Sequence, residues 1–251
     1  MQKNPLTGKV VLVTGAARSV GAEIARTLHA AGMNIVIHYN ASEEEGVKLC
    51  EELNTHRKHS AKALRADLQD DESCKALVVR TAEIWSRLDV LVNNASRFYR
   101  TELGKTTEYA WDDLMMSNLK APFFLSQSAA PFLAQQEGCI VNISDIHAER
   151  PLSGYSVYCI SKNAISMMTK ALAKELGPRV RVNAVAPGAV LWPEGENELS
   201  EKIKQKIIER TILSRSGSPK DIAKAVLFFV RDAEYVTGQI LSVDGGRSLS
   251  G

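Results

Sequence analysis

Short apolar runs alternate with longer segments of helical periodicity along the whole chain. The run at positions 10–13 is Val-Val-Leu-Val, which is continuous rather than alternating. Such a run is typical of a strand that is buried on both faces of a parallel sheet. The pattern predicts strands at 9–13, 34–39, 61–65, 89–92, 139–143, 180–185 and 240–243.

The intervening segments predict helices. We expect them at 22–31, 43–53, 72–85, 111–133, 198–210 and 221–230, with one more that begins near Tyr158 and continues to 176. Pro122 predicts a bend in the longest of them. Because strand and helix alternate without a linker or a repeat, we expect one α/β domain over 1–251. The sheet should be doubly wound, seven-stranded and mostly parallel, with helices on both faces and ligands at the carboxyl ends of its strands.

Composition and charge narrow the possible partners. Of the 251 residues, 45% are hydrophobic and 24% are charged, as in ordinary globular proteins, and the net charge is only +2. This balance gives no reason to expect a nucleic acid or an anionic membrane as partner. No apolar run approaches 18 residues and residues 1–5 lack the core of a signal peptide, so we expect no membrane span and a cytoplasmic protein.

Cysteine and histidine spacing gives no metal pattern. The four cysteines are scattered without a Cys-x-x-Cys pair, and the five histidines fall outside any ligand spacing. We therefore expect reduced thiols that serve in packing, and no metal site.

The turn after the first predicted strand contains two glycines that suit a dinucleotide. Gly15 and Gly21 allow a tight turn and a close approach of a pyrophosphate to the start of the next helix, with Arg18, Ser19 and Val20 between them. The spacing differs from G-x-G-x-x-G, and glycines after strands are also simple turn formers. The position at the first strand-to-helix junction is what favours a cofactor site.

The end of the second predicted strand indicates which dinucleotide. The residues here are His38, Tyr39, Asn40 and Ser42. None of them is an acid that could accept hydrogen bonds from the ribose hydroxyls of NAD, and Arg18 in the glycine turn can reach this strand end. This favours a 2′-phosphate and hence NADPH. The alternative is a helix cap at Ser42 and a surface arginine at position 18.

Two further strand ends complete the candidate cofactor groove. Asp67 and Leu68 follow the third strand, where the carboxylate either accepts from an adenine amino group or caps the next segment. Asn94, Ala95 and Ser96 follow the fourth strand and place small and amide side chains beside a ligand, or else form a polar turn.

Tyr158 and Lys162 form the candidate reactive pair. They are four residues apart at the start of a helix, so both lie on one helical face. A neighbouring ammonium favours phenolate and lowers a phenol pKa from about 10, which makes the tyrosine a candidate proton donor. The spacing alone is common by chance, and the alternative is a surface tyrosine beside a solvated lysine.

Taken together and in order, these residues resemble the short-chain dehydrogenase/reductase family. The resemblance covers nearly the whole chain and adds Asn118, Asn183 and the pair Pro187 and Gly188. It implies a Rossmann-like NAD(P)-dependent oxidoreductase, commonly a homotetramer, with a cofactor half at about 1–145 and a catalytic and substrate-loop half at about 146–251. It also implies that Lys162 binds the nicotinamide ribose and acidifies Tyr158, and that Asn118 supports a proton relay.

One departure from the family pattern points to a subfamily. Most members have a serine thirteen residues before the tyrosine, and here that position is Asp145. A carboxyl group beside the phenol suits a substrate with basic ring nitrogens. The Asp, the segment from Asn93 to Phe98 and the segment from His38 to Ser42 are similar to pteridine reductases.

The pteridine reductase resemblance implies a pterin stacked between Phe98 and the nicotinamide, with contacts from Ser96, Asp145 and Tyr158. Trp192 lies in a segment at 189–200 that we expect to cover the substrate as a lid, the alternative being an ordinary surface loop ahead of a helix. Phe98 could instead be a loop aromatic tucked over the core. Asp145 could instead cap the strand end while Ser144 takes the serine role.

The resulting hypothesis is NADPH-dependent reduction of a 7,8-dihydropterin, namely dihydrobiopterin, dihydromonapterin or dihydrofolate, with a relay of Tyr158, Asp145 and Lys162. Pteridine reductases usually carry two basic residues in the glycine turn, whereas here Ser19 follows Arg18, which weakens the argument for NADPH. Two alternatives remain. One is a reductase of 3-oxoacyl or sugar ketones, and the other is a dinucleotide-binding regulator without turnover.

Overall fold

The computed structural model describes residues 6–190, 192 and 199–250, and its centre is one seven-stranded sheet. The strands are β1 (Val10–Val13), β2 (Asn34–Tyr39), β3 (Ala61–Arg65), β4 (Val90–Asn93), β5 (Cys139–Ile143), β6 (Arg181–Pro187) and β7 (Ile240–Val243). Their order is β3-β2-β1-β4-β5-β6-β7, and every neighbouring pair is parallel. The sheet is thus wholly rather than mostly parallel.

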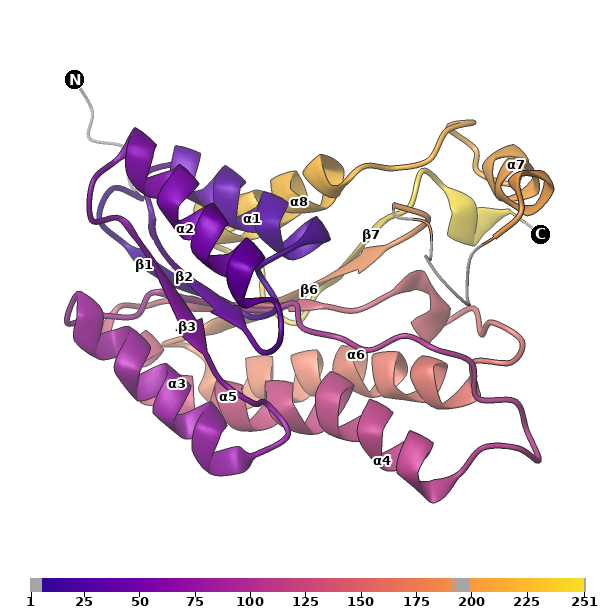
Figure 1. The fold of residues 1–251 in the computed structure, drawn as a ribbon, viewed down its shortest axis with the longest axis horizontal. Coiled ribbons are helices and arrows are strands. Elements are labelled where there is room, and N and C mark those ends of the chain that lie inside the picture. Colours follow the sequence, from indigo (N-terminus) through magenta and orange to yellow (C-terminus); the bar gives the residue numbers. More distant parts are fainter. Residues whose placement is uncertain (1–5, 191, 193–198, 251) are drawn as a thin grey trace.

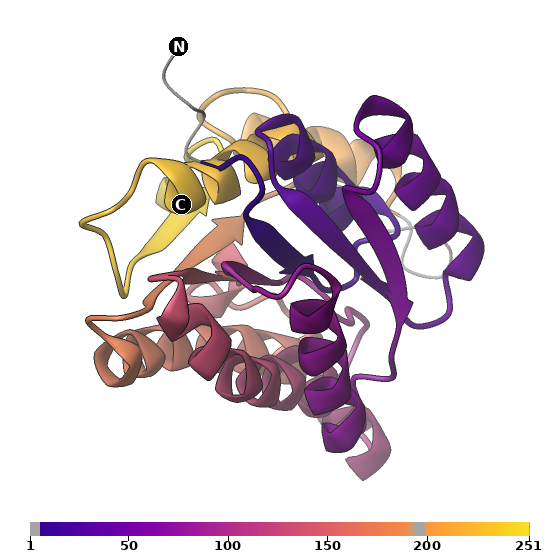
Figure 2. The same ribbon diagram turned by 90° about the vertical axis from the view of Figure 1, so that its left-hand side faces the viewer.

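Helices cover both faces of this sheet (Figures 1 and 2). On one face lie α1 (Ser19–Ala30), α2 (Glu43–His56) and α8 (Pro219–Arg231). On the other lie α3 (Asp71–Ile84), α4 (Glu108–Met115), α5 (Ala121–Gln135) and α6 (Ser156–Leu176). Helix α7 (Glu201–Glu209) and the short turn η4 (Arg247–Leu249) lie near the C-terminal end of the chain (Figure 1).

The continuous apolar strands supply two cores. Val11 and Val13 of β1 pack into the core beneath α1 and α8, whereas Val10 and Leu12 pack into the core beneath α3, α5 and α6. All four side chains have no exposed surface. Because successive side chains of a strand point to opposite faces, a run without polar residues is what a sheet covered on both sides requires.

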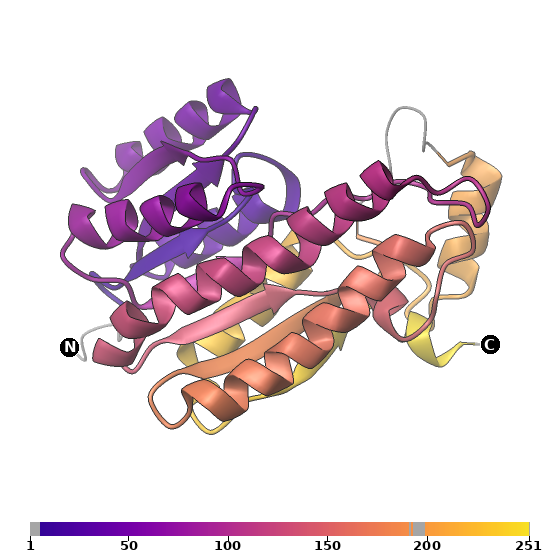
Figure 3. The same cartoon turned by 90° about the horizontal axis from the view of Figure 1, so that it is seen from below.

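The longest predicted helix is divided by a wider turn. Helix α4 continues into the π-helical turn η1 (Met116–Lys120), and α5 begins at Ala121 with Pro122 in its first turn. In an α-helix the proline ring would clash with the carbonyl group four residues earlier, which belongs to Asn118. The wider turn accommodates the ring, and such turns are frequent at functional sites. Figure 3 shows that α4, η1 and α5 follow one another along one axis and lie beside α6.

The strand order reverses beside β1, whose neighbours are β2 on one side and β4 on the other. In doubly wound sheets the ligand crevice opens at the carboxyl ends of the strands at this point. The predicted cofactor residues other than Tyr158 and Lys162 lie at or just after the carboxyl ends of β1, β2, β3, β4 and β6, and Asp145 follows β5. Tyr158 and Lys162 lie on α6.

Membrane-spanning helices and metal-ligand clusters are both absent from the described residues. None of the described helices is long and apolar enough to cross a membrane. Within the described residues, no group of three His, Cys, Asp or Glu side chains is placed to hold a metal ion, and all four cysteines are free thiols.

Candidate active site

The glycine turn packs directly against the end of β4. Gly15 has a φ of +60°, and a Cβ atom there would lie 2.9 Å from the Ala95 Cα. A Cβ atom on Gly21 would lie 2.4 Å from the Gly15 carbonyl oxygen. The Asn94 amide donates to the carbonyl oxygens of Thr14 (2.9 Å) and Gly15 (3.1 Å). Both glycines are therefore needed by the close packing of the turn, whether or not a ligand is bound.

His38 supports the same turn from β2. The Gly15 N–H donates to His38 Nδ1 (3.1 Å), and His38 Nε2 lies 3.2 Å from the Ala66 carbonyl oxygen. This pair of bonds requires the neutral ring with its proton on Nε2. Burial lowers the pKa of His38 to about 4, against its ordinary value of 6.5. The side chain, predicted to contact a cofactor, is thus engaged in holding the turn.

Arg18 lies beside helix α2, which follows the end of β2. Arg18 is exposed, and its guanidinium reaches the first turn of α2, 3.7 Å from the Glu45 carboxylate. Ser42 precedes α2 but makes no capping hydrogen bond through its side chain. Tyr39 is buried, and its hydroxyl donates to Glu43 (3.3 Å).

Asp67 is exposed at the end of β3. Its carboxylate accepts from the Gln69 N–H (3.1 Å), which is the capping role, and from the Asn40 amide (3.5 Å). Both bonds use the same oxygen, Oδ1, so the other carboxylate oxygen remains open to a further donor.

The candidate reactive group joins β5 to the first turn of α6. The Tyr158 hydroxyl donates to Asp145 Oδ2 (2.7 Å), while Oδ1 of the same carboxylate accepts from the His147 N–H (2.8 Å). Asp145 therefore caps the short turn after β5 and also holds the phenol. Lys162 donates to the Ile143 carbonyl oxygen (3.0 Å), and its Nζ lies 5.7 Å from the centre of the Tyr158 ring.

The electrostatics of this group differ from the expectation. Burial and the Asp145 carboxylate raise the pKa of Tyr158 well above its ordinary value of 10. Burial lowers the pKa of Lys162 to about 8, although Asp145 opposes this. The phenol pKa is thus raised rather than lowered in this arrangement, because burial and a carboxylate at hydrogen-bond distance both favour the protonated phenol.

Ser144 does not take the place of Asp145. It is buried, and its hydroxyl lies 3.1 Å from both the Lys162 carbonyl oxygen and the Ser166 hydroxyl. It packs beneath α6 rather than beside the phenol of Tyr158. This removes the alternative in which Ser144 acts as the family serine one position early.

Asn118 lies on the π-helical turn and holds the segment after β4. Its Oδ1 accepts from the Arg97 N–H (2.8 Å), and its amide donates to the Arg97 carbonyl oxygen (3.0 Å) and to Ser161 (3.1 Å). Both amide hydrogens are used by protein groups. The side chain therefore fixes the main chain next to Phe98.

Phe98 faces the reactive tyrosine. Its ring stacks on Tyr155 at 4.7 Å between ring centres and meets the Tyr158 ring edge-on at 4.7 Å. The Arg100 guanidinium lies over the Tyr155 ring at 5.9 Å. Tyr155 carries no signal in the sequence apart from its position three residues before Tyr158. Ser96 is exposed near the start of this segment.

The segment after β6 begins at Gly188. A Cβ atom there would lie 2.6 Å from the Asp244 Cβ. Trp192 is half-buried. Residues 191 and 193–198 of the predicted lid lie outside the described residues.

Comparison with known proteins identifies the family. A family model described as enoyl-(acyl carrier protein) reductase matches residues 15–248. "Granaticin polyketide synthase putative ketoacyl reductase 2" of Streptomyces violaceoruber is 37% identical over 96% of each chain. "Pteridine reductase 1" of Leishmania tarentolae is 35% identical over 97% of this chain and 98% of its own. The 3-oxoacyl-(acyl-carrier-protein) reductase FabG of Staphylococcus aureus is 36% identical over 95% of this chain and 97% of its own.

The chain belongs to the short-chain dehydrogenase/reductase family. It is an NAD(P)-dependent oxidoreductase of that family. The ketoacyl reductases and the pteridine reductase are about equally similar to it, at 35–37% identity.

The residues after β1 fit the dinucleotide of a short-chain dehydrogenase/reductase. The first N–H groups of α1, on Ser19, Val20 and Gly21, have no partners within the helix. The first turn contains no acidic residue, so it suits an anion. These groups would hold the pyrophosphate, and Lys162 and Tyr158 would face the nicotinamide end.

Proposed function

We propose that this chain is an NADPH-dependent pteridine reductase that converts a 7,8-dihydropterin to its tetrahydro form. The observation that carries the proposal is the hydrogen bond from the Tyr158 hydroxyl to Asp145, at 2.7 Å. In this position most family members have a serine hydroxyl, which suits a ketone or alcohol oxygen. A carboxyl group suits the ring nitrogens and exocyclic amine of a pterin, because it accepts hydrogen bonds from N–H groups.

The aromatic surface beside the phenol supports a flat substrate. Phe98 stands next to Tyr158 and is braced by the ring of Tyr155. Offset stacking on such a ring favours a planar heterocycle over a flexible acyl chain.

In the proposed reaction the hydride comes from the reduced nicotinamide when the cofactor is bound, and it reaches the carbon of a C=N bond. Tyr158 is protonated at neutral pH and can donate to the adjacent nitrogen, although its raised pKa makes it a weaker acid until a cation stabilises the phenolate. Lys162 would bind the nicotinamide ribose and, as an ammonium, would favour the phenolate left behind. Asp145 would hold both the phenol and the substrate, because its carboxylate already accepts from the Tyr158 hydroxyl.

The preference for NADPH is part of the proposal. It is supported by the reach of Arg18 to the first turn of α2 and by the absence of an acid at the end of β2. Asn40 and Ser42 are the polar side chains that would accompany the arginine around a 2′-phosphate.

A second candidate is reduction of a 3-oxoacyl or another ketone. The similarity to ketoacyl reductases at 36–37% identity favours it. The carboxyl group of Asp145 opposes it, because a carboxylate next to the phenol repels the oxyanion that forms when a ketone accepts a hydride.

The test measures the rate of NADPH oxidation with dihydrobiopterin or an acetoacetyl thioester as substrate, for the wild type, Tyr158→Phe and Asp145→Ala. We expect turnover of dihydrobiopterin by the wild type and a loss of about 10²–10⁴-fold in Tyr158→Phe, as for removal of a general acid. Asp145→Ala should lose about as much. Near-wild-type turnover of the pterin in both variants would refute the mechanism. Reduction of the thioester alone by the wild type would establish the second candidate.

A further inference from the structure

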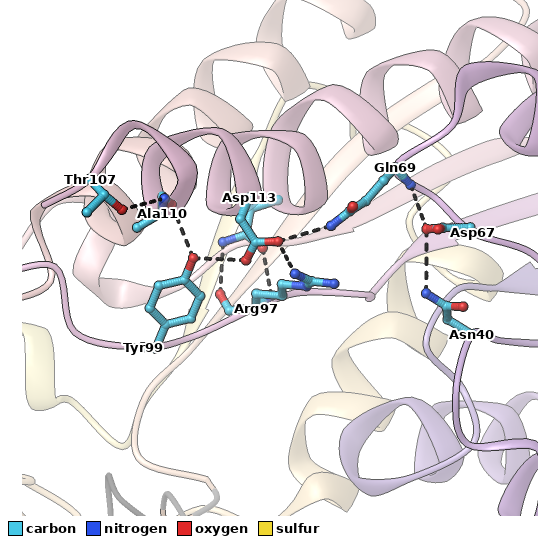
Figure 4. Close-up of polar contacts among 9 residues, drawn as sticks. Asn40, Asp67, Gln69, Arg97, Tyr99, Thr107, Ala110 and Asp113 are labelled. Carbon is cyan, nitrogen blue, oxygen red and sulfur yellow. Dashed lines mark hydrogen bonds and ion pairs between the residues drawn. The ribbon is translucent and has the colours of Figure 1, made fainter.

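Asp113 of α4 is a buried carboxylate outside the reactive group. Its side chain is only 6% exposed, yet it has three polar partners from other segments (Figure 4). The Arg97 guanidinium pairs with Oδ1, the Tyr99 hydroxyl donates to Oδ2 (2.9 Å), and the Gln69 amide donates to Oδ1 (3.0 Å). Because a buried charge is costly unless it is paired and hydrogen-bonded, this set of partners indicates a built arrangement.

Two of these partners flank Phe98 in the chain. Arg97 and Tyr99 both turn toward α4 (Figure 4), whereas Phe98 turns toward Tyr155 and Tyr158. Because Phe98 lies between two residues whose side chains are anchored on Asp113, fixing those residues also restricts the direction of its ring.

The main chain of the same segment is held independently. Asn118 accepts from the Arg97 N–H (2.8 Å) and donates to the Arg97 carbonyl oxygen (3.0 Å). Asn118 therefore sets the position of the backbone, and Asp113 sets the side-chain directions around it. Without the carboxylate, the Arg97 guanidinium loses its partner on α4, and the Tyr99 hydroxyl keeps only the Ala110 carbonyl oxygen (3.2 Å).

The contacts of Asp113 extend to the adenine end of the candidate groove. Gln69, which donates its side-chain amide to Asp113, also donates its main-chain N–H to Asp67 (3.1 Å). Asp67 in turn accepts from Asn40 (3.5 Å) (Figure 4). One carboxylate on α4 is thus connected to the end of β2, the end of β3 and the segment after β4.

We propose that Asp113 is a positioning residue that holds Phe98 in place for the substrate. It touches neither the phenol of Tyr158 nor Asp145, and it acts through Arg97 and Tyr99. The inference rests on the proposed function in one respect, namely that the substrate lies against Phe98.

The test is a double-mutant cycle of Asp113→Asn and Phe98→Ala, measured with whichever of dihydrobiopterin and the acetoacetyl thioester the wild type reduces. Asp113→Asn should raise KM about tenfold and change kcat by less than about threefold, in line with the coupling energies of contacting residues. In the Phe98→Ala background the same substitution should change KM by less than about twofold. A purely structural role would give the same KM change in both backgrounds.

Asp112→Asn is the matched control, because Asp112 is the exposed neighbour on the same helix. It should leave KM and kcat unchanged. If Asp113→Asn does not fold, Tyr99→Phe takes its place, since it removes a single hydroxyl from the carboxylate. It should raise KM about threefold, and again only when Phe98 is present.

The inference is overturned if KM stays at the wild-type value in Asp113→Asn or Tyr99→Phe, or if it rises equally with and without Phe98. Its failure is distinct from that of the proposed function. A wild type that reduces only the thioester refutes the pterin assignment, while a KM effect of Asp113 that depends on Phe98 still supports the positioning role.

Discussion

Protonation of His38 should destabilise the folded protein as the pH falls below about 6.5. In the folded state the neutral ring accepts from Gly15 and faces the Ala66 carbonyl oxygen, and burial lowers its pKa to about 4. The unfolded chain binds the proton with the ordinary pKa of about 6.5. Between these values the unfolded state holds more protons at this site, so stability is complete above pH 6.5 and is lost toward pH 4.

The magnitude follows from the two pKa values. Each pH unit between them corresponds to about 1.4 kcal/mol, so the full effect below pH 4 is about 3 kcal/mol. Between pH 7.5 and pH 5 the loss in the free energy of unfolding is about 2 kcal/mol from this residue.

The measurement compares urea unfolding of the wild type and His38→Asn at both pH values, at one protein concentration, by tryptophan fluorescence. The asparagine amide offers an acceptor and a donor but does not titrate. His29, whose pKa is also lowered to about 4, titrates in both proteins and cancels in the comparison. The wild type should lose about 2 kcal/mol more than the variant between the two pH values. Equal losses would refute the reasoning.

Three further predictions concern the site. The rate of reduction should fall above about pH 8, because Lys162 then loses the proton that favours the Tyr158 phenolate; an initial-rate profile that stays level to pH 10 would contradict this. Ser144→Ala should cost about 1 kcal/mol in urea unfolding and leave kcat unchanged, since its hydroxyl bonds only beneath α6; a large drop in kcat would restore it as a catalytic candidate. Arg18→Ala should reduce the preference for NADPH over NADH by about 10–100-fold in kcat/KM, and an unchanged ratio would show that another group binds the 2′-phosphate.

The sheet could be predicted closely from the sequence. The strands at 34–39, 61–65, 139–143 and 240–243 agree residue by residue with β2, β3, β5 and β7. Short continuous apolar runs leave few alternatives when helices cover both faces of a sheet. Helix ends agree less closely. Helix α1 begins at Ser19 rather than at 22, because the last residues of the glycine turn already belong to the helix.

The candidate site was only partly predictable, because its properties depend on contacts between distant segments. Sequence spacing placed Tyr158 and Lys162 on one face, but the raised pKa of the phenol depends on how deeply it is buried and on the Asp145 carboxylate. Likewise, His38 stood at a strand end like a ligand residue, yet its ring nitrogens are used by the protein.

Other contributors to the site carry no local signal. The carboxylate of Asp113 is one of several acids on its stretch of chain, and only the fold brings Arg97, Tyr99 and Gln69 to it. The π-helical turn at Asn118 was also missed, although Pro122 four residues later is the physical cause and was visible in the sequence.

The most direct test of the account is the ratio of kcat/KM for dihydrobiopterin to kcat/KM for an acetoacetyl thioester, measured for the wild type and for Asp145→Ser. The account predicts that the wild type favours the pterin and that the serine variant loses about 100-fold or more of its activity on the pterin, with the ratio shifting toward the ketone. A wild type that already favours the thioester, with a ratio that the substitution leaves unchanged, would contradict it.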